Sequence, residues 1–189
     1  MNNPFQNRIL LAKLKAKDGR AFVEAYDLYV DKIYRFVFYK VASAEDAQDL
    51  TSAVFLKAWD HIRENSLTDH KTLPALFYKI ARNTVIDHYR KTAKEQANVA
   101  LADSENELDL PDKSQDPAAR FALASDLAAV NEKLAELKEE YREAIVLRYI
   151  DELSIGEIAE ILEKSNGNVR ILIFRALKAL RELLEAEKK

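Results

Sequence analysis

Basic side chains gather in one stretch near the C-terminus, and their spacing suits contacts with a charged polymer. Residues 164–181 carry five lysines and arginines and no carboxylate, whereas residues 132–163 carry ten acidic and four basic side chains. Lysine and arginine neutralise phosphate oxygens, and such contacts supply much of the affinity of proteins for nucleic acid. The stretch therefore predicts a phosphate-contacting surface, and the alternative is a solvated basic face on an ordinary helix pair.

The elements that must position these cations have the layout of a helix-turn-helix. Ser154 and Glu157 form an S-x-x-E capping box at the start of a short helix. Ser165 can cap a second helix, in which apolar residues recur from Val169 to Leu183 at helical spacing. The second helix of such a motif reads the major groove. Because the motif has many false matches, spacing alone leaves a plain antiparallel helix pair as an equal alternative.

A second set of side chains suited to nucleic acid lies on a helix predicted at 74–91. Its periodicity places Tyr78, Arg82 and Tyr89 on one outward row, beside a row of lysine, asparagine, aspartate and arginine. Aromatic rings, cations and amides together suit unstacked bases, which offer a π-face, a phosphate and polar edges. Periodicity alone slightly favours the alternative, a surface helix with an internal i,i+4 ion pair.

The helix predicted from Ser43 to Ile62 has an acidic outer face. Ser43 can cap this helix, with Asp46 at its third position. Asp46 and Asp49 are three residues apart, as metal-binding carboxylates can be, but no histidine or further acid converges on them in sequence. A solvated or partner-binding face is the better interpretation.

The composition argues against an enzyme. The 189 residues include no cysteine, and the three histidines are scattered at His61, His70 and His88. No glycine-rich loop is present to hold a phosphate, and no acid–base pair has an evident cleft. We therefore predict no cofactor, no bound metal and no enzymatic activity.

The sequence also lacks the signals of export or membrane insertion. Its first residues contain no apolar core followed by a small-residue cleavage site, and no apolar run approaches the roughly 18 residues of a membrane span. A chain without cysteine is consistent with a reducing compartment. We expect a cytoplasmic protein without membrane insertion.

The predicted fold class is all-α, because 3 glycines and 4 prolines in a chain that is 48% hydrophobic favour long helices. Periodicity is lost at 92–116, and residues 93–118 carry seven acids against two bases. We predict two small helical domains, 1–91 and 117–189, joined by a flexible acidic linker at 92–116. The second domain would open with a helix capped by Asp116 and Pro117.

Four stretches resemble a known family, the alternative sigma factors of bacterial RNA polymerase of the extracytoplasmic-function (ECF) type, within the sigma-70 family. YDLYVDKIYRFVFYKV (26–41) and AEDAQDLTSAVFLKAWDHI (44–62) resemble the first half of the N-terminal sigma domain. FYKIARNTVIDHYRK (77–91) resembles its promoter-melting helix, and residues 137–180 resemble the C-terminal sigma domain. The stretches follow the order and spacing of the family.

The resemblance implies a role for each surface. For docking on the β′ clamp helices of the polymerase, the matching positions are Asp46, Asp49, Leu50, Phe55 and Trp59. For opening the minus-ten promoter element and holding flipped bases, beside the loop at 63–73, they are Tyr78, Arg82, Asn83, Asp87 and Arg90. For reading the minus-thirty-five element they are Ser165, Asn168, Arg170, Ile171, Phe174, Arg175 and Lys178.

The implied partners are core RNA polymerase, through the β′ clamp helices and the β subunit, and promoter DNA, while an anti-sigma factor is left open. Some positions depart from the family pattern. Leu76 stands where tryptophan is frequent, Ser52-Ala53 where Gln-Glu is frequent, and Glu163 where glycine is common. The second helix of the helix-turn-helix is also less polar than usual, so the upstream specificity is not readable from the sequence.

The leading hypothesis is thus an alternative sigma factor that binds core RNA polymerase and directs promoter-specific transcription initiation. The alternative is a stand-alone helix-turn-helix regulator that binds duplex DNA. The helix at 77–91 discriminates between them, because a regulator of duplex DNA has no need for Tyr78, Arg82 and Asn83 on an outward face.

Overall fold

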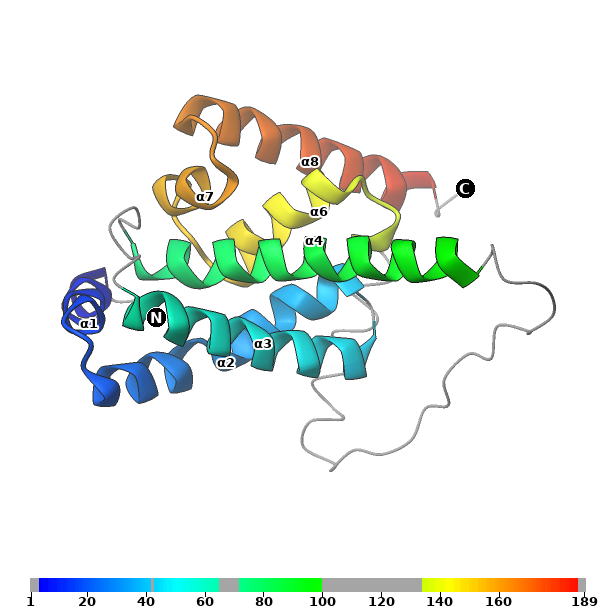
Figure 1. Ribbon diagram of the computed structural model, residues 1–189. Coiled ribbons are helices and arrows are strands. Elements are labelled where there is room, and N and C mark those ends of the chain that lie inside the picture. Colours follow the sequence, from blue (N-terminus) through cyan, green and yellow to red (C-terminus); the bar gives the residue numbers. More distant parts are fainter. Residues whose placement is uncertain (1–3, 42, 65–71, 100–133, 187–189) are drawn as a thin grey trace, which may run out of the picture.

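The computed structural model describes residues 4–41, 43–64, 72–99 and 134–186, and every regular element in these ranges is a helix, as predicted. The elements are α1 (Pro4–Lys15), α2 (Gly19–Val41), α3 (Ala44–Arg63), α4 (Leu73–Val99), α6 (Glu139–Ile145), the π-helix η2 (Val146–Ile150), α7 (Ile155–Leu162) and α8 (Asn166–Ala186). In Figure 1 the long helix α4 runs between a layer formed by α2 and α3 and a layer formed by α6, α7 and α8. None of the described helices is long and apolar enough to span a membrane.

Side-chain caps begin several of these helices. The backbone N–H of Asp46 donates to Ser43 Oγ at 3.2 Å at the start of α3. At α7 the Ser154 N–H donates to Glu157 Oε2 at 2.8 Å and the Glu157 N–H donates to Ser154 Oγ at 3.2 Å, so the predicted capping box is confirmed. Ser165 accepts from the Asn168 N–H at 3.2 Å, as predicted for the second helix.

The turn of the helix-turn-helix is closed by a residue in the left-handed region. Glu163 ends α7 with φ 55° and ψ 41°. This is the position at which the family commonly has glycine, whose missing Cβ makes that conformation less costly. Glu163 therefore still closes the turn, although its backbone is more strained in this conformation than that of a glycine would be.

Three parts of the chain differ from the sequence predictions or lie beyond them. Helix α1 was not predicted, and its buried residues Leu10, Leu11 and Leu14 pack it against the body of the protein. The predicted end of the 74–91 helix was wrong, because α4 continues to Val99. The rest of the predicted linker, and all but the end of the helix predicted to follow Pro117, lie outside the described residues.

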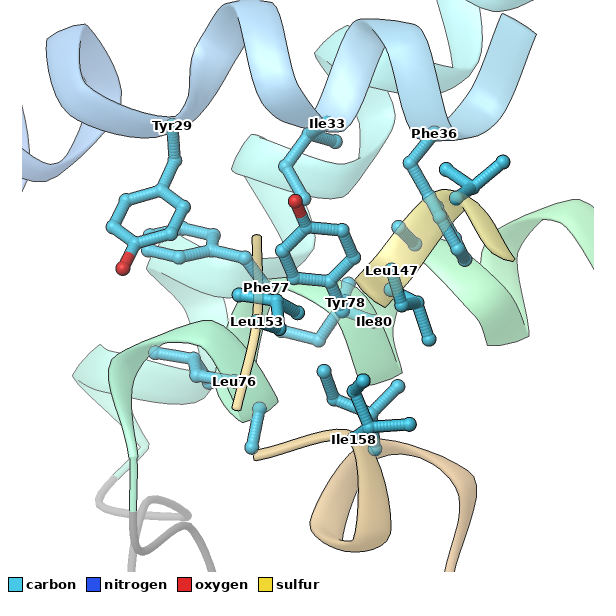
Figure 2. Close-up of a cluster of buried hydrophobic side chains, with 14 of the residues drawn as sticks. Tyr29, Ile33, Phe36, Leu76, Phe77, Tyr78, Ile80, Leu147, Leu153 and Ile158 are labelled. Atoms are coloured by element: carbon cyan, nitrogen blue, oxygen red, sulfur yellow. The ribbon is translucent and has the colours of Figure 1, made fainter. Parts of the chain in front are cut away.

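The N-terminal and C-terminal halves share one hydrophobic core. Figure 2 shows the side chains that meet there, namely Tyr29, Ile33 and Phe36 from α2, Leu76, Phe77, Tyr78 and Ile80 from α4, and Leu147, Leu153 and Ile158 from η2, the loop after it and α7. Burying each large apolar side chain is worth about 1.5–3 kcal/mol. The core therefore places the C-terminal half directly on α4. That each half folds as a separate domain stays a prediction.

Candidate nucleic-acid interface

Helix α8 presents its cations to solvent. Val169, Ile173 and Ala176 form its buried stripe. Ile171 and Phe174 point outward, with 52% and 70% of their surface exposed. The remaining predicted minus-thirty-five positions, Ser165, Asn168, Arg170, Arg175 and Lys178, are all exposed. Helix α8 therefore has a basic face that also carries large apolar side chains, with Leu177 exposed beside Ile171 and Phe174.

The ion pairs on α8 leave this face accessible. Lys178 Nζ lies 3.8 Å from Glu182 Oε1, and Arg181 Nε lies 2.7 Å from Glu185 Oε1. Both are exposed i,i+4 pairs, which typically contribute only about 0.3–0.5 kcal/mol. Because both pairs are exposed, they leave the cations of α8 in contact with solvent.

The prediction that Tyr78 points outward from α4 was wrong. Its side chain is fully buried, with 0% exposure, and its ring packs edge-to-face on Phe36 with centroids 5.1 Å apart. Every residue from Leu73 to Tyr78 is buried, because α2 and α3 cover one side of α4 and the C-terminal half covers the other. Burial raises the pKa of the Tyr78 hydroxyl well above its usual value, and the neighbouring Asp151 carboxylate adds to the effect.

The other predicted minus-ten residues lie further along α4 and reach the surface. Asn83, Asp87 and Arg90 are exposed, and the Asp87 carboxylate is 3.5 Å from Lys57 Nζ of α3. Arg82 is half-buried, and its Nε lies 3.3 Å from Glu143 Oε1 of α6. The structure therefore brings together Arg82, Asn83, Asp87 and Arg90 on the accessible part of α4, and separates Tyr78 from them.

Three further ion pairs hold the C-terminal half on α2. Asp151, whose side chain is fully buried, lies 3.2 Å from the Arg35 guanidinium. Burial raises the pKa of Asp151, and Tyr78 and Arg35 oppose that rise. Lys40 Nζ lies 3.0 Å from Glu139 and 3.3 Å from Glu143, and its ammonium lowers the pKa of Glu139. These contacts join residues about a hundred positions apart, which is why no local sequence pattern indicated them.

The acidic face of α3 adjoins an aromatic groove. Asp49 is exposed, whereas Asp46, Leu50 and Trp59 are half-buried. The prediction placed Phe55 on this surface, but the ring is only 4% exposed. It sits in an aromatic cluster, with centroids 4.8 Å from Tyr26, 5.2 Å from Phe77 and 6.5 Å from Phe22. Phe55 therefore forms the floor of this surface.

The groove itself has a volume of about 470 Å³ and lies between α2 and α3. Its lining consists of Phe22, Tyr26, Thr51, Ser52, Phe55, Leu56 and Trp59. The sequence interpretation missed Tyr26 and Leu56 as surface residues, although 67% of Leu56 is exposed. A leucine on the acidic outer face of α3 was the available signal, because a solvated face has no need of it.

Known families match both halves of the chain. A family profile described as Sigma-70 region 2 matches residues 25–95, and one described as Sigma-70, region 4 matches residues 127–180. The ECF RNA polymerase sigma factor SigW of Bacillus subtilis is 32% identical over 184 residues, which cover 92% of this chain and 94% of SigW. The chain belongs to the ECF RNA polymerase sigma factors. As an alternative sigma factor, it directs promoter-specific transcription initiation, which decides against the stand-alone regulator.

Other relatives of this sigma factor belong to the same family. SigM of Bacillus subtilis is 31% identical, with 85% of this chain and 93% of SigM covered. BldN of Streptomyces coelicolor is 30% identical over 93% of this chain, and the chain spans 64% of the length of BldN. Sigma factors are DNA-binding initiation factors rather than enzymes. Among the described residues, no cluster of three or more histidines and carboxylates is placed to hold a metal.

Two solved structures resemble the fold of this sigma factor. The structure of CnrH in complex with the cytosolic domain of CnrY gives a TM-score of 0.68 at 25% identity, with 95% of this chain and 97% of CnrH covered. The sigma factor RpoE of Bartonella quintana, in complex with the anti-sigma factor NepR, gives a TM-score of 0.65 at 24% identity, with 87% and 96% covered.

Proposed function

We propose that this sigma factor docks on core RNA polymerase through the α2–α3 groove and the acidic residues beside it. The observation that carries the proposal is an exposed aromatic groove next to Asp49, a carboxylate without an ion pair in the described part of the chain. Large apolar surfaces rimmed by charge are typical of protein interfaces. The family resemblance names the partner surface as the β′ clamp helices, with further contacts to the β subunit.

The accessible part of α4 is proposed to bind the melted minus-ten strand. Arg82 and Arg90 supply cations for phosphates, while Asn83 supplies an amide that can pair with a base edge. Tyr78, which is buried, packs the first turns of α4 against Phe36 of α2. The same proposal includes the domain division at 1–91, 92–116 and 117–189. This division places α4 and α8 in different domains, so that each can contact its own promoter element.

Helix α8 is proposed to enter the major groove at the minus-thirty-five element. Its exposed arginines and Lys178 suit phosphates and guanine edges, and Ile171 and Phe174 suit the methyl groups of thymine. An anti-sigma factor is a further proposed partner, since RpoE, whose fold resembles this one, was solved in complex with the anti-sigma factor NepR. We place the protein in the cytoplasm, with no catalytic residues of its own.

The test is run-off transcription with core polymerase on a promoter library, combined with a pull-down of the polymerase. Asp49→Arg reverses a charge beside the groove and is expected to weaken polymerase binding at least about tenfold, with unchanged circular dichroism. Asp31→Arg is the matched control, because Asp31 is exposed on the side of α2 opposite Phe22 and Tyr26. Equal binding by both variants would remove this groove as the docking surface.

Strand opening has its own test. Arg82→Ala/Asn83→Ala in holoenzyme is expected to abolish permanganate reactivity of the minus-ten region while polymerase binding is kept. Wild-type reactivity in this variant would make α4 a structural helix only.

A further inference from the structure

The outermost row of side chains on the first half of α8 is apolar. Gly167, Ile171 and Phe174 recur at intervals of four and three residues, so they lie on one face of the helix. All three are exposed, whereas Val169 and Ile173 on the other side of the helix are buried. Guanine and adenine are read by paired hydrogen bonds from arginine, lysine, asparagine or glutamine. The row from Gly167 to Phe174 contains none of these residues, so it cannot read a base in that way.

Cations border this apolar row on both sides. Arg170 and Arg175 are exposed and lie to either side of it, and no carboxylate occurs in residues 164–181. The major groove of DNA is likewise bordered by two phosphate backbones, with base edges and thymine methyl groups between them. The charge pattern of α8 therefore favours a DNA groove as the surface that covers Ile171 and Phe174.

Gly167 has no evident reason within the chain to be a glycine. Its φ is not positive, and a Cβ at this position would meet Ser165 Oγ at 3.9 Å, which is an ordinary contact. Glycine within a helix is also less favourable than alanine. A residue that lowers helix stability, at the head of the exposed row, indicates a place where another molecule comes close to the backbone of α8.

We propose that α8 reads the minus-thirty-five element through methyl groups, with Ile171 and Phe174 on the C5-methyl groups of two neighbouring thymines and Gly167 allowing the DNA to come close. This inference rests on the proposed function of α8. Residues three apart are separated by about 4.5 Å along a helix axis, and successive nucleotides of one strand by about 3.4 Å along the duplex. The two side chains can therefore contact adjacent thymines at the same time, which makes them specificity-determining residues.

The experiment compares thymine with uracil, which lacks only the C5-methyl group. Promoters selected from the library by the wild-type holoenzyme are rebuilt with deoxyuridine in place of thymidine, in the minus-thirty-five segment alone. Competition against the unmodified promoters then gives the ratio of the two affinities. Burial of one methyl-sized group corresponds to about a four-fold change in affinity. We therefore expect the loss of two contacted methyl groups to weaken holoenzyme binding about ten-fold.

Two variants of α8 assign this ratio to residues. Ile171→Ala/Phe174→Ala should bind the thymine and uracil promoters with affinities that agree within about two-fold, because the side chains that contact the methyl groups are gone. The matched control is Leu184→Ala, which removes a leucine that is 45% exposed near the other end of α8. This control should keep the full ratio. Each ratio compares two DNAs on one protein, so it does not depend on how much of a variant is folded.

Gly167→Ala tests the close approach separately. The added methyl group has room in the free protein, so thermal stability should stay the same or rise. Binding of the holoenzyme to the unmodified promoters should nevertheless weaken at least about five-fold, comparable to one mismatched base pair. Unchanged binding by this variant would remove Gly167 from the reading surface.

Equal affinities of the wild-type holoenzyme for the thymine and uracil promoters would overturn the inference, and a protein partner would then be the better candidate to cover Ile171 and Phe174. A ratio that survives Ile171→Ala/Phe174→Ala would also overturn it, because the methyl groups would be read elsewhere. In both cases the proposed function of α8 stands if Arg170→Ala/Arg175→Ala still weakens promoter binding. Binding that does not depend on the sequence of the minus-thirty-five segment would instead contradict the proposed function itself, and the inference with it.

Discussion

The two faces of the N-terminal half differ in what covers them. On the α2–α3 side, Leu56 and Asp49 are exposed beside an open aromatic groove. On the α4 side, Tyr78 is buried and Arg82 is paired with Glu143 from the other half of the chain. The surface proposed for polymerase is thus available in the free protein, while part of the surface proposed for melted DNA is occupied. Polymerase can therefore reach its proposed site without movement of the C-terminal half, whereas a DNA strand can reach Arg82 fully only after Glu143 has moved away.

The largest expected effect is a loss of stability when Phe55, the buried floor of the groove, is changed, compared with Leu56 on its exposed rim. Phe55→Ala removes a ring that contacts Tyr26, Phe77 and Phe22, and it should lower the free energy of unfolding by about 3–5 kcal/mol. Leu56→Ala, at a neighbouring exposed position, should change stability by less than about 0.5 kcal/mol and still weaken polymerase binding. Urea denaturation and a polymerase pull-down measure the two quantities. Similar destabilisation by both changes would contradict the division into floor and rim.

The buried ion pair should be next in size. Arg35→Met keeps most of the side-chain volume but leaves the fully buried Asp151 without its cation, and should cost about 3 kcal/mol of stability. Adding Asp151→Asn should restore part of that loss, because the buried charge is then removed as well. Thermal denaturation of the single and double variants forms the test. Additive losses would show that the two groups do not interact.

Burial of Tyr78 also predicts a loss of stability at alkaline pH. The folded state raises the pKa of this hydroxyl, so above pH about 10 the unfolded chain ionises it while the folded chain keeps the proton. Stability should therefore fall as pH rises, by up to about 1.4 kcal/mol per pH unit for this group. Tyr78→Phe should show a shallower decline in urea denaturation between about pH 9.5 and 11, because an exposed tyrosine ionises near pH 10. An identical slope would mean that Tyr78 is open to solvent.

The smallest effects belong to the accessible part of α4. Asn83→Ala should change the free energy of unfolding by no more than about 0.5 kcal/mol. Lys57→Ala, which removes the exposed partner of Asp87, should cost at most about 1 kcal/mol. Chemical denaturation of both variants checks this. A loss above about 2 kcal/mol from either change would place that side chain in the folding core.

Local patterns predicted the helices well because their determinants are local. The capping box of Ser154 and Glu157 and the cap at Ser43 involve residues three apart, and both formed. The helical spacing of apolar residues from Val169 onward also predicted the second helix, in which Val169, Ile173 and Ala176 are buried. Helix α1 escaped prediction because its apolar residues surround the helix, with Phe5 and Ile9 exposed opposite the buried leucines.

The burial of Tyr78 could not be predicted from the same kind of pattern. Periodicity marks one face of a helix as buried, but the first two turns of α4 are covered on both sides. The second cover comes from Asp151 and Leu147, about 70 positions further along the chain. Phe55 was misplaced for a related reason, because its partners Phe22 and Tyr26 belong to the neighbouring helix.

Hydrogen–deuterium exchange of the full chain, with and without core polymerase, tests the central claim most directly. Docking through the α2–α3 groove should protect backbone amides in α3. The buried first turns of α4 and η2 lie away from the groove and should not gain protection in the same complex. Unchanged exchange in α3 together with greater protection of α4 and η2 would contradict the account, because polymerase would then bind near the C-terminal half and not at the α2–α3 groove.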